Sequence, residues 1–189
     1  MIKKKLVYVG LSADILHEGH INILKISNRL GDVIVGLLTD KAIASYKKIP
    51  HLSYKQREIV LKNIKFVSKV IPQKTLDYSD NLNLIKPDYV VHGNDWKSGI
   101  QKETRAKVIK EIKKWGGKLI EPTYTKNISS TLIKKKISEI ISTENRVSRL
   151  KRLIHSKNIV RILESHNSLT GLIIENLKIK KKKKDLEFD

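Results

Sequence analysis

Short apolar runs alternate with helical stretches along most of the chain, and this alternation limits the fold more than any other feature of the sequence. The apolar runs are rich in Val, Ile and Leu, as strands buried on both faces are. They occupy residues 5–9, 33–38, 69–71, 89–92 and 119–120. Helical patterns occupy residues 18–30, 53–64, 80–86, 104–115 and 130–141. Strands that alternate with helices favour a parallel sheet covered on both faces, so we predict an α/β fold with a doubly wound parallel sheet.

The chain divides into two parts by this pattern. Residues 1–142 hold all the expected strands and are predicted to form one domain, whereas residues 143–189 are predicted to form a short, helical, lysine-rich extension. Within the domain, the helix at 53–64 begins with a capping-box spacing. We expect its apolar side to consist of Ile59, Val60 and Ile64.

The charge balance is strongly basic, with 39 Lys and Arg against 19 Asp and Glu and a net charge of +20. Because the excess is spread over both parts, it favours attraction of polyanions such as a nucleoside triphosphate over a dedicated nucleic-acid-binding arm. No apolar run is long enough to span a membrane, and the one that follows Met1 is too short for a signal peptide. The chain has no cysteine, which excludes disulfides and thiolate metal sites. We therefore expect a cytoplasmic protein without membrane or dedicated nucleic-acid partners.

Chemically interesting residues follow the expected strands. In doubly wound sheets, ligands bind beyond the carboxyl ends of the strands. This places the segments 10–20, 39–48, 92–96 and 124–131 around one crevice. The sequence therefore predicts a single ligand site formed by these four segments.

The first segment contains two histidines at the start of an expected helix. Free backbone amides at a helix start suit an anion, and the imidazoles of His17 and His20 can donate hydrogen bonds to phosphate oxygens. Gly19 would let a phosphate approach the backbone closely. Two alternatives stay open: the histidines cap the helix, or they bind zinc, although His51 and His92 are too isolated to supply a convincing third ligand.

The spacing His17-x-Gly19-His20 after a first strand resembles the nucleotidyltransferases whose hallmark is HxGH. Three further blocks narrow the resemblance to the cytidylyltransferase branch, which includes the glycerol-3-phosphate cytidylyltransferases. They are residues 53–57 (SYKQR), 92–96 (HGNDW) and 128–131 (ISST), which resemble the family's SYxxR, GDDW and ISTT. The resemblance covers residues 5–140 and implies a Rossmann-like fold and transfer of CMP from CTP.

The resemblance also implies roles for individual residues. His17, His20 and Lys48 would act on the triphosphate as catalytic residues. Lys47, Arg57 and Tyr124 would contact the acceptor or support the site. Mg²⁺ would accompany CTP, no residue is assigned as a metal ligand, and a homodimer is expected. The nucleotide-binding positions would be Gly10, Leu11, Ser12, Asp14, Gly19, His92, Asp95, Trp96, Thr125, Ser129, Ser130 and Thr131.

Each of these roles has a structural alternative. Lys47 and Lys48 also fit a solvated charge pair, and Trp96 also fits a core position. Residues 129–131 also fit a helix N-cap. Arg57 fits a salt bridge as well as a ligand contact, and Asp14 fits either a local organiser or a metal-linked group.

Departures from the family pattern concern the acceptor. The family's Gly-Thr-Phe-Asp is replaced by residues 10–14 (GLSAD), a family lysine is replaced by Tyr46, and Tyr124-Thr125 stands where an Arg-Thr pair is common. Two cations near the substrates are thus missing. These departures point away from glycerol 3-phosphate and towards another phosphorus-bearing acceptor.

The extension carries a second resemblance. Residues 149–179, above all 162–171 (ILESHNSLTG), resemble the opening of phosphoenolpyruvate mutase, the barrel enzyme that forms the carbon–phosphorus bond of phosphonates. A whole barrel needs about 250 residues, so we expect no mutase activity in this chain. The alternative is an ordinary pair of C-terminal helices with a lysine-rich tail.

Together these observations predict an enzyme that transfers CMP from CTP to a small phosphonate, such as 2-hydroxyethylphosphonate or 2-aminoethylphosphonate, and releases pyrophosphate. The first alternative acceptor is glycerol 3-phosphate or a related alcohol phosphate. Alternatives of other classes are a CTP-binding assembly module without turnover and polyanion binding through the lysine-rich tail.

Overall fold

The computed structural model describes most of the chain, which forms two units, Met1–Thr143 and Glu144–Asp189. The described residues are 4–97, 101–123, 125, 129–130, 133, 146–160, 163–176, 178–181 and 184–187.

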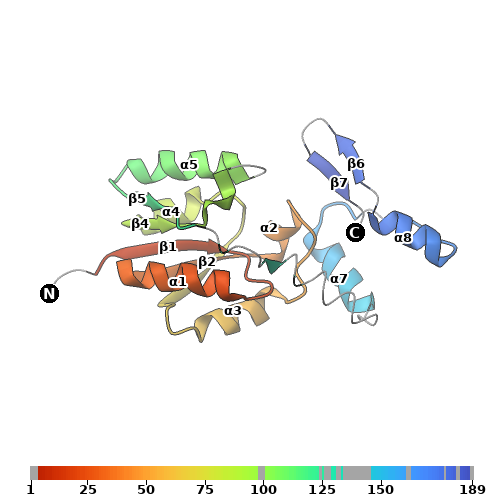
Figure 1. Ribbon diagram of the computed structural model, residues 1–189, viewed down its shortest axis with the longest axis horizontal. Coiled ribbons are helices and arrows are strands. Elements are labelled where there is room, and N and C mark those ends of the chain that lie inside the picture. Colours follow the sequence, from red (N-terminus) through yellow and green to blue (C-terminus); the bar gives the residue numbers. More distant parts are fainter. Residues whose placement is uncertain are drawn as a thin grey trace. The chain divides into compact units, whose positions relative to one another are not determined.

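The first unit is built on a five-stranded parallel sheet with the order β3-β2-β1-β4-β5. Its first strand therefore lies in the middle, with later strands added on either side (Figure 1). This order confirms the predicted doubly wound sheet. The strands are β1 (Leu6–Leu11), β2 (Asp32–Leu38), β3 (Lys69–Gln73), β4 (Tyr89–Val91) and β5 (Lys118–Ile120).

Helices cover both faces of the sheet, α1 and α3 on one face and α4 and α5 on the other (Figure 1). A parallel sheet needs this double cover because its strands are apolar on both sides. The described helices of this unit are α1 (Glu18–Leu30), α2 (Asp40–Ala44), α3 (Tyr54–Lys62), α4 (Ser79–Ile85), η1 (Asn94–Lys97) and α5 (Lys102–Lys113).

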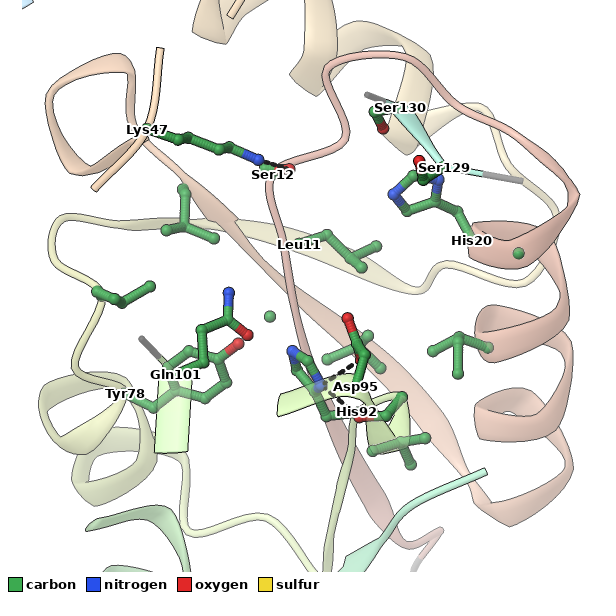
Figure 2. Close-up of a pocket in the computed structure, with 18 of the residues that line it drawn as sticks. Leu11, Ser12, His20, Lys47, Tyr78, His92, Asp95, Gln101, Ser129 and Ser130 are labelled. Carbon is green, nitrogen blue, oxygen red and sulfur yellow. Dashed lines mark hydrogen bonds and ion pairs between the residues drawn. The ribbon is translucent and has the colours of Figure 1, made fainter. Parts of the chain in front are cut away.

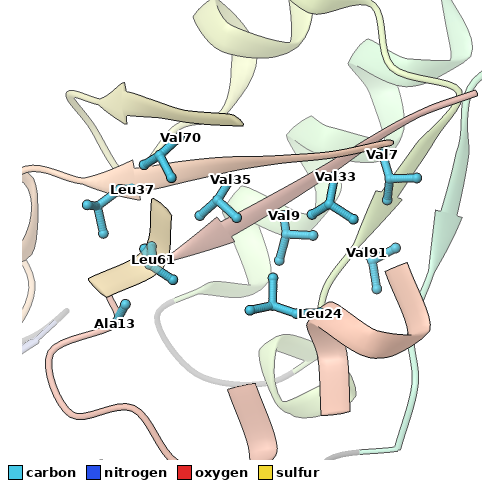
Figure 3. Packing of buried hydrophobic residues seen from close by; sticks show 10 residues of the cluster. All are labelled: Val7, Val9, Ala13, Leu24, Val33, Val35, Leu37, Leu61, Val70 and Val91. Atoms are coloured by element: carbon cyan, nitrogen blue, oxygen red, sulfur yellow. The ribbon is translucent and has the colours of Figure 1, made fainter. Parts of the chain in front are cut away.

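The core has one layer on each face of the sheet. On the first face, side chains of β1 and β2 pack against Leu24 of α1 and Leu61 of α3 (Figure 3). On the second face, Tyr8 and Val90 pack against Leu82 of α4 and the helix α5. Val7 and Val9 face the first layer while Tyr8 between them faces the second, because successive side chains of a strand point to opposite faces. The sheet is thereby held from both sides and forms a rigid support for the loops at its edge.

One helix packs differently from the expectation. The capping box at the start of α3 is confirmed, since Ser53 caps the amide of Gln56 and the Gln56 side chain accepts from the amide of Ser53. The expected apolar side is correct for Ile64, which packs against the core, but wrong for Ile59 and Val60, which are exposed; α3 turns Arg57 and Leu61 inward instead. The helix thus buries Arg57, whereas apolar periodicity alone predicts that Ile59 and Val60 are buried.

In the described part of the second unit there are two helices, α7 (Arg146–Ser156) and α8 (Ser168–Asn176), and an antiparallel hairpin of β6 (Lys178–Lys181) and β7 (Lys184–Glu187). The helices agree with the expected extension, but the hairpin shows that the extension is not helical throughout. In α8, Asn167 caps the helix start, where its side chain accepts from the amide of Thr170. The helix expected at 130–141 lies almost entirely outside the described residues.

Candidate active site

A pocket lies at the carboxyl ends of the strands, where the sequence placed the ligand site (Figure 2). Its lining comes from all four predicted segments, and from the turns before α4 and α5 as well. The described residues that line it are Val9, Gly10, Leu11, Ser12, His17, Gly19, His20, Ile23, Leu38, Tyr46, Lys47, Leu76, Tyr78, Val91, His92, Gly93, Asp95, Gln101, Ser129 and Ser130.

Gly10 at the end of β1 leaves room for an aromatic side chain. A methyl group at this position would overlap the ring of Tyr78, which is almost completely buried at the pocket wall. The glycine therefore lets Tyr78 lie directly against the central strand, between Gly10 and Trp96, whose ring centroid is 6.0 Å away. Gly10 is thus required by close packing as well as by its place beside the ligand site.

His17 and His20 lie together at the start of α1. His17 is the N-cap residue, and the two ring centroids are 4.0 Å apart. The Nδ1 atom of His20 accepts a hydrogen bond from the backbone amide of His17, at 3.4 Å, so we assign the proton of the neutral ring to Nε2. His20 therefore offers an N–H donor beside the free amides of the helix start, which suits a phosphate oxygen.

Both imidazoles are neutral near pH 7. Burial lowers the pKa of His20 to about 4, with further lowering by His17 and Lys47, whose positive charges would repel a second one. Burial also lowers the pKa of His17, although Glu18 opposes this. Before an anion enters the pocket, the two rings thus offer hydrogen-bond donors without carrying a positive charge.

Gly19 keeps the ring of His17 close to the helix. A Cβ atom there would lie 3.0 Å from the His17 ring and 3.6 Å from the side chain of Thr125. Thr125 itself accepts a hydrogen bond from Asn22 of α1, at 3.3 Å, and thereby lies beside the helix that carries both histidines.

The structure places Lys47 at the pocket and leaves Lys48 outside it. Both side chains are exposed, but only Lys47 is among the lining residues, and its Nζ donates to the hydroxyl of Ser12 at 3.2 Å. Of the two lysines, Lys47 is therefore the one that lies where a ligand in this pocket could meet it. Adjacent lysines in a loop cannot be told apart by sequence alone, because the turn after α2 decides which one points inward.

Arg57 is a structural clamp rather than a ligand contact. Its guanidinium is fully buried and donates to the carbonyl groups of Ser12, Leu38 and Leu52 and to the carboxylate of Asp40. These groups lie at the carboxyl ends of β1 and β2 and in the loop before α3. Arg57 therefore holds together the backbone that forms the pocket rim.

Asp14 organises the same loop. It is buried, and its carboxylate accepts a hydrogen bond from the amide of Leu52 at 3.0 Å. This hydrogen bond joins the turn after β1 to the turn before α3. Of the two roles expected for Asp14, it favours that of a local organiser over that of a metal-linked group.

Trp96 lies in the core behind the pocket. It is buried, is not among the lining residues, and donates from its indole nitrogen to Glu121 at 2.7 Å. Its ring stacks under His92, with centroids 3.9 Å apart and planes 8° from parallel. Arg105 pairs with the same Glu121 through two hydrogen bonds. Trp96 thus supports His92 from below, and this arrangement favours the core alternative for the tryptophan.

The remaining predicted residues lie partly within the described structure. Ser129 and Ser130 line the pocket, and Ser130 donates to the carbonyl of Ile15 at 3.2 Å. Tyr124 and Thr131 lie outside the described residues. Ser129 and Ser130 lie on the side of the pocket that holds His20 (Figure 2).

Leu76, Tyr78 and Gln101 line the pocket from loops that lie outside the four predicted segments. Leu76 and Tyr78 lie between β3 and α4, and Gln101 precedes α5. The only signal in the sequence is that these loops also follow strands of the parallel sheet, at the same edge as the predicted segments. Tyr46 stands where the family pattern has a lysine, and it also lines the pocket. Burial raises the pKa of its hydroxyl to about 12.

The described side chains do not form a metal cage. Within the described ranges, no group of three or more His, Cys, Asp or Glu side chains could hold an ion. Mg²⁺ in nucleotide enzymes is commonly held by substrate phosphates and water with one or two carboxylates. The donor set here fits an ion that enters with a triphosphate, and Asp95 is the carboxylate available among the described lining residues.

The chain is similar to known cytidylyltransferases. A family described as cytidylyltransferase-like matches residues 8–136. The glycerol-3-phosphate cytidylyltransferase of Bacillus spizizenii is 36% identical over 96 residues, which are 50% of this chain and 74% of that enzyme. The ethanolamine-phosphate cytidylyltransferase of Mus musculus is 32% identical over 123 residues, which are 62% of this chain and 29% of that enzyme. A solved structure, the lipopolysaccharide core biosynthesis protein from Thermoplasma volcanium GSS1, matches with a TM-score of 0.57 and 27% identity over 65% of this chain and 99% of that chain.

The fold and the site thus define a nucleotidyltransferase with a Rossmann-like sheet. The chain belongs to the cytidylyltransferase-like family. The prediction of a CTP-dependent cytidylyltransferase is thereby confirmed at the level of the enzyme class. Among the described residues, no helix has the length and apolar character needed to cross a membrane.

Proposed function

We propose that this enzyme transfers CMP from CTP to a small phosphonate and releases pyrophosphate. The observation that carries CMP transfer is the pocket itself, where neutral imidazole donors at the start of α1 face a lysine across the carboxyl end of β1. Support for a phosphonate comes from Tyr46, which lines the pocket where related enzymes carry a second lysine, and from the resemblance of residues 149–179 to phosphoenolpyruvate mutase.

The reaction would proceed by direct displacement at phosphorus. A phosphonate oxygen attacks the α-phosphorus of CTP, and the bond from that phosphorus to the bridging oxygen breaks. The bridging oxygen leaves with the electron pair as part of pyrophosphate, and the product is a CMP-phosphonate anhydride. Because the attacking oxygen is ionised near neutral pH, no side chain has to remove a proton.

The side chains would act by positioning and by electrostatic stabilisation. Nε2 of His20 and the ring of His17 would donate to the oxygens of the α-phosphate as negative charge builds up there. Lys47 would neutralise charge from the opposite wall, and the hydroxyls of Ser129 and Ser130 would bind the outgoing phosphates. Mg²⁺, bound through the triphosphate, would supply further charge neutralisation.

The test is pyrophosphate release with CTP and Mg²⁺ across a panel of acceptors. The panel holds 2-hydroxyethylphosphonate, 2-aminoethylphosphonate, glycerol 3-phosphate and phosphocholine, with ATP as the control donor. Release with CTP and either phosphonate, at least tenfold faster than with the phosphate esters, is the expected result. Comparable or faster release with a phosphate ester would overturn the phosphonate assignment.

The second candidate is an alcohol-phosphate cytidylyltransferase. It is favoured by the similarity to the glycerol-3-phosphate cytidylyltransferase of Bacillus spizizenii. The same panel separates the two, because this candidate requires the fastest release with one of the two phosphate esters, glycerol 3-phosphate or phosphocholine. A CTP-binding module without turnover would instead bind CTP and release no pyrophosphate with any acceptor.

The expected homodimer stays a prediction. Sedimentation of the purified chain tests it.

A further inference from the structure

A buried network of hydrogen bonds joins the middle of the sheet to the loop after β3. The hydroxyl of Tyr8 donates to Oε1 of Gln73 at 2.5 Å and accepts from the side-chain amide of Asn81 at 2.9 Å. Burial raises the pKa of Tyr8, so the hydroxyl keeps the proton that this donation needs. The side-chain nitrogen of Gln73 in turn donates to the carbonyl of Thr75 at 3.2 Å. Tyr8 and Gln73 are almost completely buried, where such bonds are strong and costly to break.

Gly36 makes this network possible. Tyr8 belongs to β1 and Gln73 ends β3, so the central part of β2 lies between them. A Cβ atom on Gly36 of β2 would overlap the Tyr8 hydroxyl and would lie 2.7 Å from Oε1 of Gln73. The glycine therefore lets the phenol of Tyr8 cross β2 and reach the end of β3.

The loop that this network holds supplies one wall of the pocket. Leu76 and Tyr78 of the loop line the pocket, and the ring of Tyr78 packs edge to face on the ring of Tyr8, with centroids 5.8 Å apart. The loop has a second anchor on the surface, where Lys107 of α5 pairs with Asp77 at 2.7 Å. Because exposed ion pairs contribute little, the buried network is the stronger of these two anchors.

This wall lies on the side from which an acceptor would approach. In the proposed reaction, Ser129 and Ser130 bind the outgoing phosphates. Figure 2 shows Tyr78 across the pocket from these two serines. The attacking and leaving oxygens of a phosphoryl transfer lie roughly in line, on opposite sides of the phosphorus. The acceptor oxygen would therefore reach the α-phosphorus from the side of Tyr78.

We infer that Tyr8 and Gln73 are positioning residues for the acceptor, because their hydrogen bonds hold Leu76 and Tyr78 at the place where the acceptor binds. The inference rests on the proposed function for the direction of attack. It goes beyond that function by assigning a role to two side chains that are not among the described lining residues. A shift of the wall by about 1 Å would misplace the acceptor, and a misplacement of this size can cost about a hundredfold in rate. The phosphates of CTP, bound on the other side of the pocket, would be affected much less.

Three variants separate positioning from stability. Tyr8→Phe removes the hydroxyl and leaves Oε1 of Gln73 buried without its donor. Gln73→Met removes the contacts to Tyr8 and to the loop together. The double variant replaces both partners by apolar groups, which costs less stability than one buried group without a partner. Its free energy of unfolding should therefore recover relative to Tyr8→Phe, although the tie to the loop is still missing.

Tyr89→Phe is the matched control. It removes the same hydroxyl group from the first residue of β4, where the hydroxyl accepts from Lys5 at 2.9 Å, at the end of the strand away from the pocket. Thermal unfolding of every variant checks that the fold is kept.

The experiment measures kcat and the separate KM values for CTP and for the acceptor. The acceptor is the compound of the four in the panel that the wild-type chain uses fastest. If the wild type turns over none of them, titration calorimetry of the same four compounds with the α,β-methylene analogue of CTP present gives acceptor Kd values instead. A failure of the proposed phosphonate transfer is therefore distinguishable from a failure of this inference.

Tyr8→Phe and Gln73→Met should each raise the KM or Kd for the acceptor about tenfold and change that for CTP less than threefold. The control Tyr89→Phe should change neither value more than twofold. The double variant should regain stability relative to Tyr8→Phe and keep the acceptor defect, whereas a merely structural role would restore acceptor affinity together with stability. That restoration would overturn the inference. It would equally be overturned by acceptor constants within threefold of the wild type in folded variants, by an equal loss for CTP, or by a wild type that binds none of the four acceptors.

Discussion

At the scale of single residues, the site depends on which of several similar side chains reaches the pocket. Lys47 and Lys48 are adjacent, yet only Lys47 lines the pocket and meets Ser12. His17 and His20 are both imidazoles, yet only His20 is buried enough for its pKa to fall to about 4. Such differences arise from backbone direction and burial, which a motif does not encode.

The two lysines provide a matched pair for mutation. Lys47→Ala should lower kcat/KM for CTP about tenfold to a hundredfold, because a charge-assisted contact to phosphate is worth about 1.5–3 kcal/mol. Lys48→Ala removes the same charge one residue later and should change kcat/KM less than threefold. Steady-state rates of pyrophosphate release measure both. A larger loss in Lys48→Ala than in Lys47→Ala would return the role to Lys48.

Stability should fall in acid through His20. Its pKa is about 4 in the folded chain against an ordinary value of 6.5, so between these values the unfolded chain binds a proton that the folded chain excludes. The stabilisation is therefore complete above pH 6.5 and is lost as the pH falls towards 4, by about 3 kcal/mol in total. Urea unfolding at pH 7 and pH 4.5 measures this loss. His20→Asn should show a smaller loss than the wild type, and an equal loss would show that His20 is not responsible.

At the scale of secondary-structure elements, a buried charge cluster joins three segments. Arg57 of α3 reaches the ends of β1 and β2 and the first residue of α2. Four hydrogen bonds, one of which is also the ion pair with Asp40, compensate the loss of hydration of the buried guanidinium. The pocket rim therefore depends on α3 even though α3 supplies none of the described lining residues.

Removing the clamp should destabilise the domain strongly. Arg57→Met would leave Asp40 and three carbonyl groups without this partner, at a cost of about 3–5 kcal/mol in the free energy of unfolding. Lys55→Met, on the exposed side of the same helix, is the matched control and should cost less than 1 kcal/mol. Chemical denaturation measures both. Similar values for the two variants would rule out the clamp.

Sequence reasoning succeeded where a local signal was strong. The helix at 18–30, the capping box at Ser53 and all five strands were predicted, because each has its own periodicity or cap. It failed where tertiary contacts decide: Arg57 displaced Ile59 and Val60 from the buried face of α3. The short helices α2 and η1 were also missed, since five and four residues are too few to show a helical period.

At the scale of the whole molecule, the site follows from topology. Parallel strands end at one edge of the sheet, so segments far apart in the sequence meet there, and four of them could be predicted to do so. The turns that carry Tyr78 and Gln101 could not, because no residue pattern marks a loop as facing the pocket. The basic charge of the chain suits a triphosphate ligand without identifying it.

The pocket should not require the second unit. Every described lining residue lies between Val9 and Ser130, within the unit that ends at Thr143. A chain shortened to residues 1–143 should bind CTP with a Kd within about threefold of the full chain. Calorimetry on both proteins gives the comparison, and circular dichroism checks the fold of the short form. Loss of binding in a folded short form would assign part of the site to residues 144–189.

The central claim is that the imidazole pair at the start of α1 drives CMP transfer to a phosphonate. The most direct measurement is ³¹P NMR of the product formed from CTP and 2-aminoethylphosphonate or 2-hydroxyethylphosphonate, by the wild-type chain and by a folded His20→Ala variant. We expect a new pair of coupled phosphorus signals, one phosphonate and one phosphate, together with pyrophosphate, and a rate at least a hundredfold lower in His20→Ala. Pyrophosphate without a coupled phosphonate signal, or an undiminished rate in His20→Ala, would contradict it.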